Sequence, residues 1–278
     1  METKIPIICL SVFSMLTIGL KIEKNKLFND KLFFYSVGIG LIINFLLLPV
    51  LALMIGNLFS LSKEHILGLY LCAICPGGSS GAFFVLRANG NPNLAGVLTS
   101  FMSIGNILIT PVLFSLFTGN NSSFDPRIML KLFLTTLLVQ GIPLFLGVLI
   151  QAMKKNSAPK IAKLTGKLAM ASLLAAMVIL TFKNYSLIFS FSMNAWFSVF
   201  LVLTFAILSG FLGIGLDESS KGTISMVSGI KSLSTALLLT EIFVQNPNTN
   251  LIILLYGLNM YWFSELGSRV WKRKKHDF

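Results

Sequence analysis

The residues best suited to bind a ligand interrupt an otherwise apolar segment, residues 66–85. Positions 75–82 read Cys-Pro-Gly-Gly-Ser-Ser-Gly-Ala. Proline cannot donate a backbone hydrogen bond and glycine leaves the backbone uncovered. We therefore expect a helix break at Pro76, Gly77, Gly78 and Gly81. The hydroxyls of Ser79 and Ser80, with the free N–H groups of the next half-helix, suit an anion. A proline kink with close helix packing is the alternative.

A second apolar segment, residues 222–243, is interrupted in the same way by Ser-Gly-Ile-Lys-Ser at positions 228–232. Two interrupted segments in corresponding halves of a chain point to a transporter's binding site near the middle of the membrane. The candidate binding residues of this second break are Ser228, Lys231 and Ser232, and Gly229 is a candidate helix-break residue.

Lys231 is the most informative single residue of this break. A lysine at the centre of a membrane span costs at least ~3 kcal/mol and normally faces a cavity. The ten Asp and Glu residues all lie in connectors, at termini or toward span ends, so no obvious carboxylate neutralises it. Three roles stay open: an amine that loses its proton on burial, a counter-ion for an anionic substrate, or a fixed tether. If the span is misplaced, Lys231 instead extends to the membrane edge.

The composition excludes an ordinary soluble domain. Hydrophobic residues make up 55% of the chain, charged residues 12%, and the mean hydropathy is +0.83, which indicate an all-α, multi-pass protein in a lipid bilayer. The net charge of +12 comes from Lys and Arg in short connectors, so we expect no nucleic-acid partner.

Cys9, Cys72 and Cys75 lack the second Cys pair or His cluster of a metal site. No catalytic constellation is present, and we expect no enzyme, metal or cofactor.

A span needs about 20 apolar residues, and the sequence predicts nine transmembrane helices. Their ranges are 5–22, 32–59, 64–88, 93–117, 127–153, 161–189, 195–216, 222–243 and 250–271. The first range lacks a cleavage site and is kept as a helix rather than a signal peptide. Of the Lys and Arg residues in the connectors, one side of the membrane holds only Lys4, Lys63, Arg127, Lys131 and Lys183. The richer side is cytoplasmic by the positive-inside rule, which puts the N-terminus outside, the C-terminus inside and the protein in the cytoplasmic (inner) membrane.

In this topology the two interrupted segments run in opposite directions. Each is the second-last span of its half, so the chain divides into a four-helix repeat (5–117) and an inverted five-helix repeat (127–271). Residues 1–278 then form a single transmembrane domain. The sequence does not set the oligomeric state.

Three motifs together resemble the bile acid:sodium symporter family. They are Cys-Pro-Gly-Gly-Ser-Ser-Gly at 75–81, Arg-Ala-Asn-Gly-Asn at 87–91 and Leu-Ala-Gly-Val-Leu-Thr-Ser at 94–100. Residues 14–20 and 44–49 are similar to the family's early Met-Gly-x-x-Leu and Gln-Phe-x-x-x-Pro motifs. The resemblance implies a core domain with two crossing broken helices, a panel domain, and a substrate site in the cleft between them.

The sequence departs from the family's sodium-using pattern at the ligand positions. The family's Ser-Asn pair aligns with Gly81 and Ala82. Its Glu-x-Gly-x-Gln-Asn string aligns with residues 227–232, so that Val227 stands where the family has Glu and Lys231 where it has Gln. Sodium needs oxygen ligands, and a nearby ammonium repels it. Oxygens from Asn44, Thr99 and Ser103 remain available without restoring the lost charge.

We therefore expect a secondary transporter of a small organic anion that works by alternating access without sodium coupling. One alternative is a proton-coupled carrier in which Lys231 carries the proton. The other is a transport-inactive membrane sensor or assembly module with the same fold.

Overall fold

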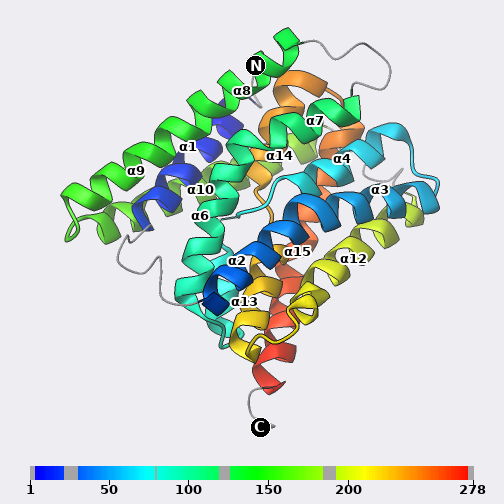
Figure 1. Cartoon of the computed structure of the whole chain (residues 1–278). Coiled ribbons are helices and arrows are strands. Elements are labelled where there is room, and N and C mark those ends of the chain that lie inside the picture. The colour runs from blue at the N-terminus through cyan, green and yellow to red at the C-terminus, as the bar shows by residue number, and fades with distance from the viewer. Residues whose placement is uncertain (1–3, 22–30, 79, 119–125, 184–191, 275–278) are drawn as a thin grey trace.

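The computed structural model describes residues 4–21, 31–78, 80–118, 126–183 and 192–274 (Figure 1). Over these ranges the chain is helical, and the single β-bridge pairs Pro76 with Lys231. The α-helices are α1 (Lys4–Lys21), α2 (Lys31–Ile42), α3 (Leu48–Leu58), α4 (Lys63–Ile74), α5 (Gly81–Arg87), α6 (Pro92–Leu108), α7 (Thr110–Thr118), α8 (Pro126–Thr136), α9 (Ile142–Met153), α10 (Ala158–Lys183), α12 (Met193–Leu208), α13 (Glu218–Gly229), α14 (Leu233–Leu239) and α15 (Pro247–Lys274). The π-helices η2 (Ile43–Leu47), η4 (Leu137–Gly141) and η6 (Thr240–Val244) and the 3-10 helix η5 (Ser209–Leu212) join some of them.

Every range expected to span the membrane contains helix, and residues 22, 79 and 184–189 of these ranges lie outside the described residues. Within the described ranges, four continuous helical stretches are long and apolar enough to cross a bilayer: Lys4–Lys21, Leu32–Leu58, Leu130–Met153 and Met193–Leu212. The pair Pro92–Leu108 and Thr110–Phe117, bent by 48°, makes a fifth if it counts as one span. These features, with exposed apolar residues such as Leu58, Phe145 and Trp262 on the surface, fit a multi-pass membrane protein. The count of nine spans stays a prediction.

Capping residues fix where the interrupted helices and their neighbour α6 begin. The Ser62 side chain accepts a hydrogen bond from the His65 N–H at the start of α4, and Asp217 accepts one from the Ser220 N–H at the start of α13. Asn91 caps α6, whose first residue is Pro92. Such side chains satisfy N–H groups that lack a partner within the helix. The sequence therefore determines locally where the helices leading into both breaks start.

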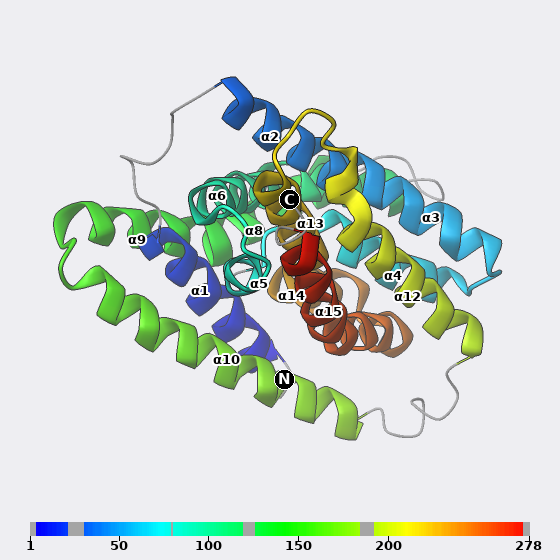
Figure 2. The ribbon, with the colours of Figure 1, turned by 90° about the horizontal axis from the view of Figure 1, so that it is seen from below.

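Two groups of helices lie side by side (Figure 2). In the first group, which we call the peripheral layer, α1 packs against α9 and α10. Gly19 and Gly147 allow the close contact between α1 and α9, because a Cβ on Gly147 would lie 2.5 Å from the Leu16 carbonyl oxygen. Small residues permit such close packing in membranes. Thr17 donates a hydrogen bond of 2.7 Å to Thr165 and so joins α1 to α10.

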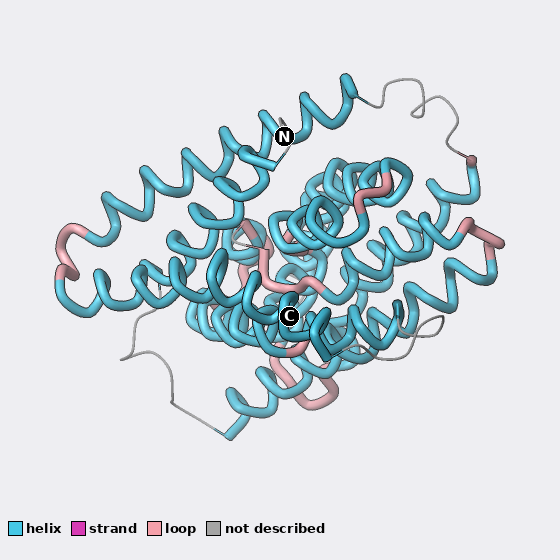
Figure 3. Tube along the Cα trace, turned by 90° about the horizontal axis from the view of Figure 1, so that it is seen from above, coloured by secondary structure: helices cyan, strands magenta, loops and turns pink. Residues whose placement is uncertain are grey.

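The second group, which we call the central bundle, contains α2–α7 and α12–α15. Its interior is filled by buried apolar side chains from several helices, including Leu69, Leu98, Met102 and Val227. The non-helical segments between α4 and α5 and between α13 and α14 lie inside this bundle, surrounded by helices (Figure 3). Since Cys75, Pro76 and residues 230–232 are buried, their backbone groups depend on the protein for hydrogen bonds.

Candidate functional site

The two helix breaks pair with each other. Helix α4 ends at Ile74 and α5 begins at Gly81, while α13 ends at Gly229 and α14 begins at Leu233. Between these ends, the Gly78 N–H donates to the Ile230 carbonyl at 3.3 Å. The Ser232 N–H donates to the Cys75 carbonyl at 2.7 Å. The backbone groups that each break frees are therefore partly satisfied by the other break.

Polar side chains from α6 and α7 satisfy further carbonyls of the first break. The Asn106 amide donates a short hydrogen bond to the Pro76 carbonyl. The Thr110 hydroxyl donates to the Ile74 carbonyl at 2.7 Å and to the Asn106 Oδ1 at 2.9 Å. These contacts replace the intrahelical hydrogen bonds that the break removes, so α6 and α7 hold the first break in place.

Glycines allow the two breaks to approach closely. Gly77 has a φ of +87°, a left-handed conformation that glycine adopts without strain. A Cβ on Gly78 would lie 2.6 Å from both the Ile230 side chain and the Lys231 carbonyl oxygen. The candidate break residues Pro76, Gly77 and Gly78 thus lie at the crossing itself, whereas Gly81 begins α5 and Gly229 ends α13.

Lys231 is buried, with 2% of its surface exposed. Its Nζ donates to the Asn44 Oδ1 at 2.7 Å and to the Ala73 carbonyl at 3.4 Å. Asn44 lies in the π-helix η2, and its amide donates in turn to the Ser228 Oγ at 2.7 Å and to the Gly40 carbonyl at 2.9 Å. No described Asp or Glu side chain is fully buried. The partners of the Lys231 amine are therefore neutral oxygens.

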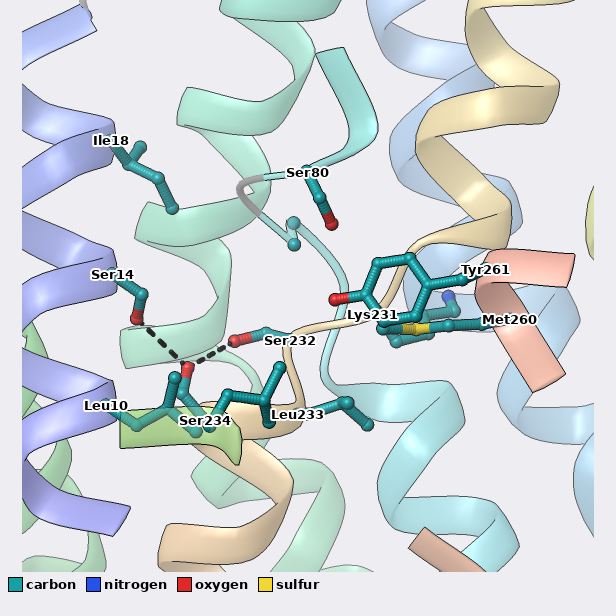
Figure 4. A pocket seen from close by; sticks show the side chains of 13 residues that line it. Leu10, Ser14, Ile18, Ser80, Lys231, Ser232, Leu233, Ser234, Met260 and Tyr261 are labelled. Atoms are coloured by element: carbon teal, nitrogen blue, oxygen red, sulfur yellow. Dashed lines mark hydrogen bonds between the residues drawn. The ribbon is translucent and has the colours of Figure 1, made fainter. Parts of the chain in front are cut away.

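A cavity of about 50 Å³ lies between the peripheral layer and the crossing (Figure 4). This volume holds a few water molecules. On the peripheral side it is lined by Leu10, Ser14 and Ile18 of α1 and by Leu173 of α10. On the other side it is lined by Gly77, Gly78, Ser80, Lys231, Ser232, Leu233, Ser234, Met260 and Tyr261. Lys231 borders the cavity, but its Nζ bonds to Asn44, which is not a lining residue.

A chain of hydrogen-bonded side chains joins the peripheral layer to α14, and we call it the hydroxyl chain. The Ser14 Oγ in α1 donates to the Ser234 Oγ at 3.2 Å. The Ser232 Oγ lies 3.0 Å from the Ser234 Oγ and 2.8 Å from the Thr235 Oγ1. Thr235 donates to the Oε1 of Gln140 in η4 at 3.2 Å. Among the described residues, the buried Gln140 Nε2 has no hydrogen-bond partner.

The remaining predicted site residues are spread around the crossing. Ser80 and Ser232 line the cavity, and Ser228 bonds to Asn44 instead. Thr99 and Ser103 are buried in α6 and line no part of the cavity. The Ser103 hydroxyl donates to the Thr99 carbonyl at 2.8 Å, while the Thr99 hydroxyl has no partner in the described part of the chain. Ser79 lies outside the described residues.

Sequence reasoning missed four residues of this region: Ser14, Ser234, Gln140 and Tyr261. Ser14 and Gln140 are polar residues in apolar segments, a pattern that marks polar contacts between membrane helices. Ser234 follows Ser232 by two positions. Tyr261 carries no signal that separates it from the other aromatic residues of α15.

Paired helix breaks inside a multi-pass helical bundle, beside a cavity between two groups of helices, define a protein of the membrane-transporter class. Residues 7–191 match the family model of the Sodium Bile acid symporter family. The chain belongs to this family, whose members are transporters and not enzymes.

Three relatives illustrate the distance within the family. The "Probable sodium/metabolite cotransporter BASS1, chloroplastic" of Oryza sativa subsp. japonica is 25% identical over 240 residues, which cover 85% of this chain and 58% of the relative. The "Hepatic sodium/bile acid cotransporter" of Rattus norvegicus is 25% identical over 230 residues, covering 79% and 62%. The "Uncharacterized sodium-dependent transporter YocS" of Bacillus subtilis is 25% identical over 126 residues, covering 45% and 38%. The chain therefore spans less than two thirds of the length of these relatives.

Proposed function

We propose that this chain is a secondary transporter that moves a small organic anion across the cytoplasmic membrane by alternating access. The observation that carries the proposal is the cavity between α1 and α10 on one side and the paired breaks on the other. Alternating access requires a site between two bodies that can move against each other. The peripheral layer and the central bundle are suitable bodies, because each has its own close packing.

The lining of the cavity supports an anionic substrate. Four hydroxyls face it or border it, from Ser14, Ser80, Ser232 and Ser234, with the phenol of Tyr261 beside them (Figure 4). Hydroxyls donate hydrogen bonds to carboxylate oxygens, and none of the described lining residues is an Asp or Glu. The volume of about 50 Å³ is far below the ~300–1,000 Å³ of sites for drug-sized ligands. A small anion therefore fits the site better than a sterol.

The proposed architecture is a nine-span inverted repeat, with residues 5–117 and 127–271 as its halves, the N-terminus outside and the C-terminus in the cytoplasm. The antiparallel pairing of the two breaks supports this arrangement, because an inverted repeat brings equivalent helices together in opposite directions. The distribution of Lys and Arg supports the orientation.

We further propose that transport does not require sodium. The two positions at which sodium-using relatives are expected to carry ligands face each other here, since a Cβ on Gly81 would lie 3.6 Å from the Val227 Cα. Neither Gly81, Ala82 nor Val227 has a side-chain oxygen. Sodium binding needs such oxygens, so the site lacks the groups that would hold the ion.

Reconstitution into liposomes tests the proposal. Purified protein in proteoliposomes should take up radiolabelled small carboxylates in a saturable manner, above the level of protein-free liposomes. The same carboxylates should raise the melting temperature of the protein in detergent, because a ligand that binds only the folded state stabilises it. If none of a broad set of organic anions is taken up or shifts the melting temperature, the transport-inactive module is the correct reading.

A further inference from the structure

The buried amine of Lys231 joins three elements that are far apart in the sequence. Lys231 lies in the break between α13 and α14, Asn44 lies in η2, and Ala73 lies near the end of α4. The amine contacts an oxygen of each of the other two, at 2.7 Å and 3.4 Å. Asn44 extends the connection to Ser228 in α13. One side chain thus holds the second break against both the π-helix and the first interrupted helix.

The need for a donor at this point follows from the first break. The last carbonyls of a helix have no partner within it. Four successive carbonyls around the end of α4 each receive a different donor: Lys231 serves Ala73, Thr110 serves Ile74, Ser232 serves Cys75 and Asn106 serves Pro76. The Lys231 amine is the only one of these donors that also binds a side-chain oxygen of η2.

Carbonyl and amide oxygens that converge on one buried point are the kind of ligand that a hard cation takes. Here a covalently attached amine fills that point. We propose that the Lys231 amine is a built-in substitute for a coupling cation: it binds the oxygens of Asn44 and Ala73 permanently and holds the crossing together without a bound ion. This inference deepens the proposed function, because it names the group that takes the place of sodium.

The geometry separates this role from that of a substrate ligand. Lys231 lines the cavity, but its Nζ donates to Asn44 and to the Ala73 carbonyl, and neither Asn44 nor Ala73 is a lining residue. An anion in the cavity would therefore meet the hydroxyls of Ser80, Ser232 and Ser234 first.

A double-variant cycle tests the contact between the amine and Asn44. Lys231→Met and Asn44→Leu should each lower the melting temperature in detergent, and the double variant should lose less than the sum of the two single losses, because both remove the same interaction. Asn259→Leu is the matched control, since the Asn259 amide bonds to the Leu255 carbonyl of its own helix. It should add its small effect independently to that of Lys231→Met. Strictly additive losses for Lys231→Met and Asn44→Leu would overturn the inference.

A second experiment tests whether the Lys231 amine takes the place of a bound cation. Melting temperatures are compared in sodium chloride and in N-methylglucamine chloride at equal ionic strength. The parent should show no difference. The variant Val227→Glu/Lys231→Gln, which restores a carboxylate and removes the amine, should melt at least about 3 °C higher in sodium, as expected for an ion that binds only the folded state. Val227→Glu alone should not respond, because the amine remains.

Either of two results would contradict the proposal that the amine replaces a cation: a sodium-specific shift in the melting temperature of the parent, or no such shift in the paired variant. If the paired variant does not fold, Val227→Asp/Lys231→Gln, which also supplies a carboxylate and removes the amine, is measured in the same two salts, with the same expected direction. These measurements need no transport activity, so a failed uptake experiment and a failed cation substitution are told apart.

Discussion

Ser14 in α1 and Ser234 in α14 share a hydrogen bond of 3.2 Å across the boundary between the peripheral layer and the central bundle. The bond belongs to the hydroxyl chain that continues through Ser232 and Thr235 to Gln140. Movement of the peripheral layer against the bundle would have to break it. In the proposed alternating access, the hydroxyl chain would therefore connect the movement of the peripheral layer to the side chains at the cavity.

Ser234→Ala should weaken this connection. We expect a loss of about 0.5–1.5 kcal/mol in the free energy of unfolding, the value of a typical buried hydrogen bond. The accessibility of a cysteine introduced at Leu173, which lines the cavity, should rise at the same time, because the layers separate more easily. The control is Ser36→Ala, whose hydroxyl donates to the Leu32 carbonyl of its own helix. Equal accessibility in both variants would contradict the role of Ser234 as a contact between layers.

Gly78→Ala should disturb the crossing. The added Cβ would lie 2.6 Å from the Lys231 carbonyl oxygen, and such overpacking costs about 1–3 kcal/mol. Anion binding should weaken as well, since Gly78 lines the cavity. Gly96→Ala in α6 is the control, because nothing lies within 4 Å of its added Cβ. It should stay within about 1 kcal/mol of the parent. Thermal melting of both variants measures the difference.

Replacement of sodium by a large organic cation should leave the uptake rate within a factor of about two. Coupling worth ~1.4 kcal/mol would instead change the rate about tenfold. The measurement is initial uptake into proteoliposomes at constant ionic strength. A steep dependence on sodium would show that oxygens such as those of Asn44 and Thr99, with backbone carbonyls, rebuild an ion site.

A cysteine introduced at Asn156, which is exposed between α9 and α10, should react with an impermeant reagent only from the cytoplasmic side. Lys63→Cys, exposed at the start of α4, should react only from outside. Both are made in a background without Cys9, Cys72 and Cys75. The positive-inside distribution is the physical basis of this orientation. Labelling of position 156 in intact cells would reverse the proposed topology.

Lys231→Gln should leave anion affinity within about threefold, or ~0.6 kcal/mol, while it lowers the melting temperature. A direct ion pair with the substrate would instead be worth about 1.5–3 kcal/mol. Binding titrations on the purified variant separate the two roles. A large loss of affinity with unchanged stability would make Lys231 a substrate ligand.

The sequence by itself determined the class of the protein and the location of its breaks. Apolar length, Pro76 with its glycines, and capping residues such as Asp217 act through the local chain or through the lipid around it. They need no knowledge of which helices become neighbours, so the breaks could be placed from the sequence.

Only the tertiary structure decided what the polar groups contact. The sequence established that Lys231 lacks an obvious carboxylate but left its role open, because the choice depends on whether Asn44 or the cavity lies within reach of its amine. The hydroxyl chain was missed for the same reason, since Ser14, Ser234 and Gln140 come from three helical segments that are distant in the chain. Contacts of this kind are fixed by how whole helices pack, and no local pattern of residues encodes them.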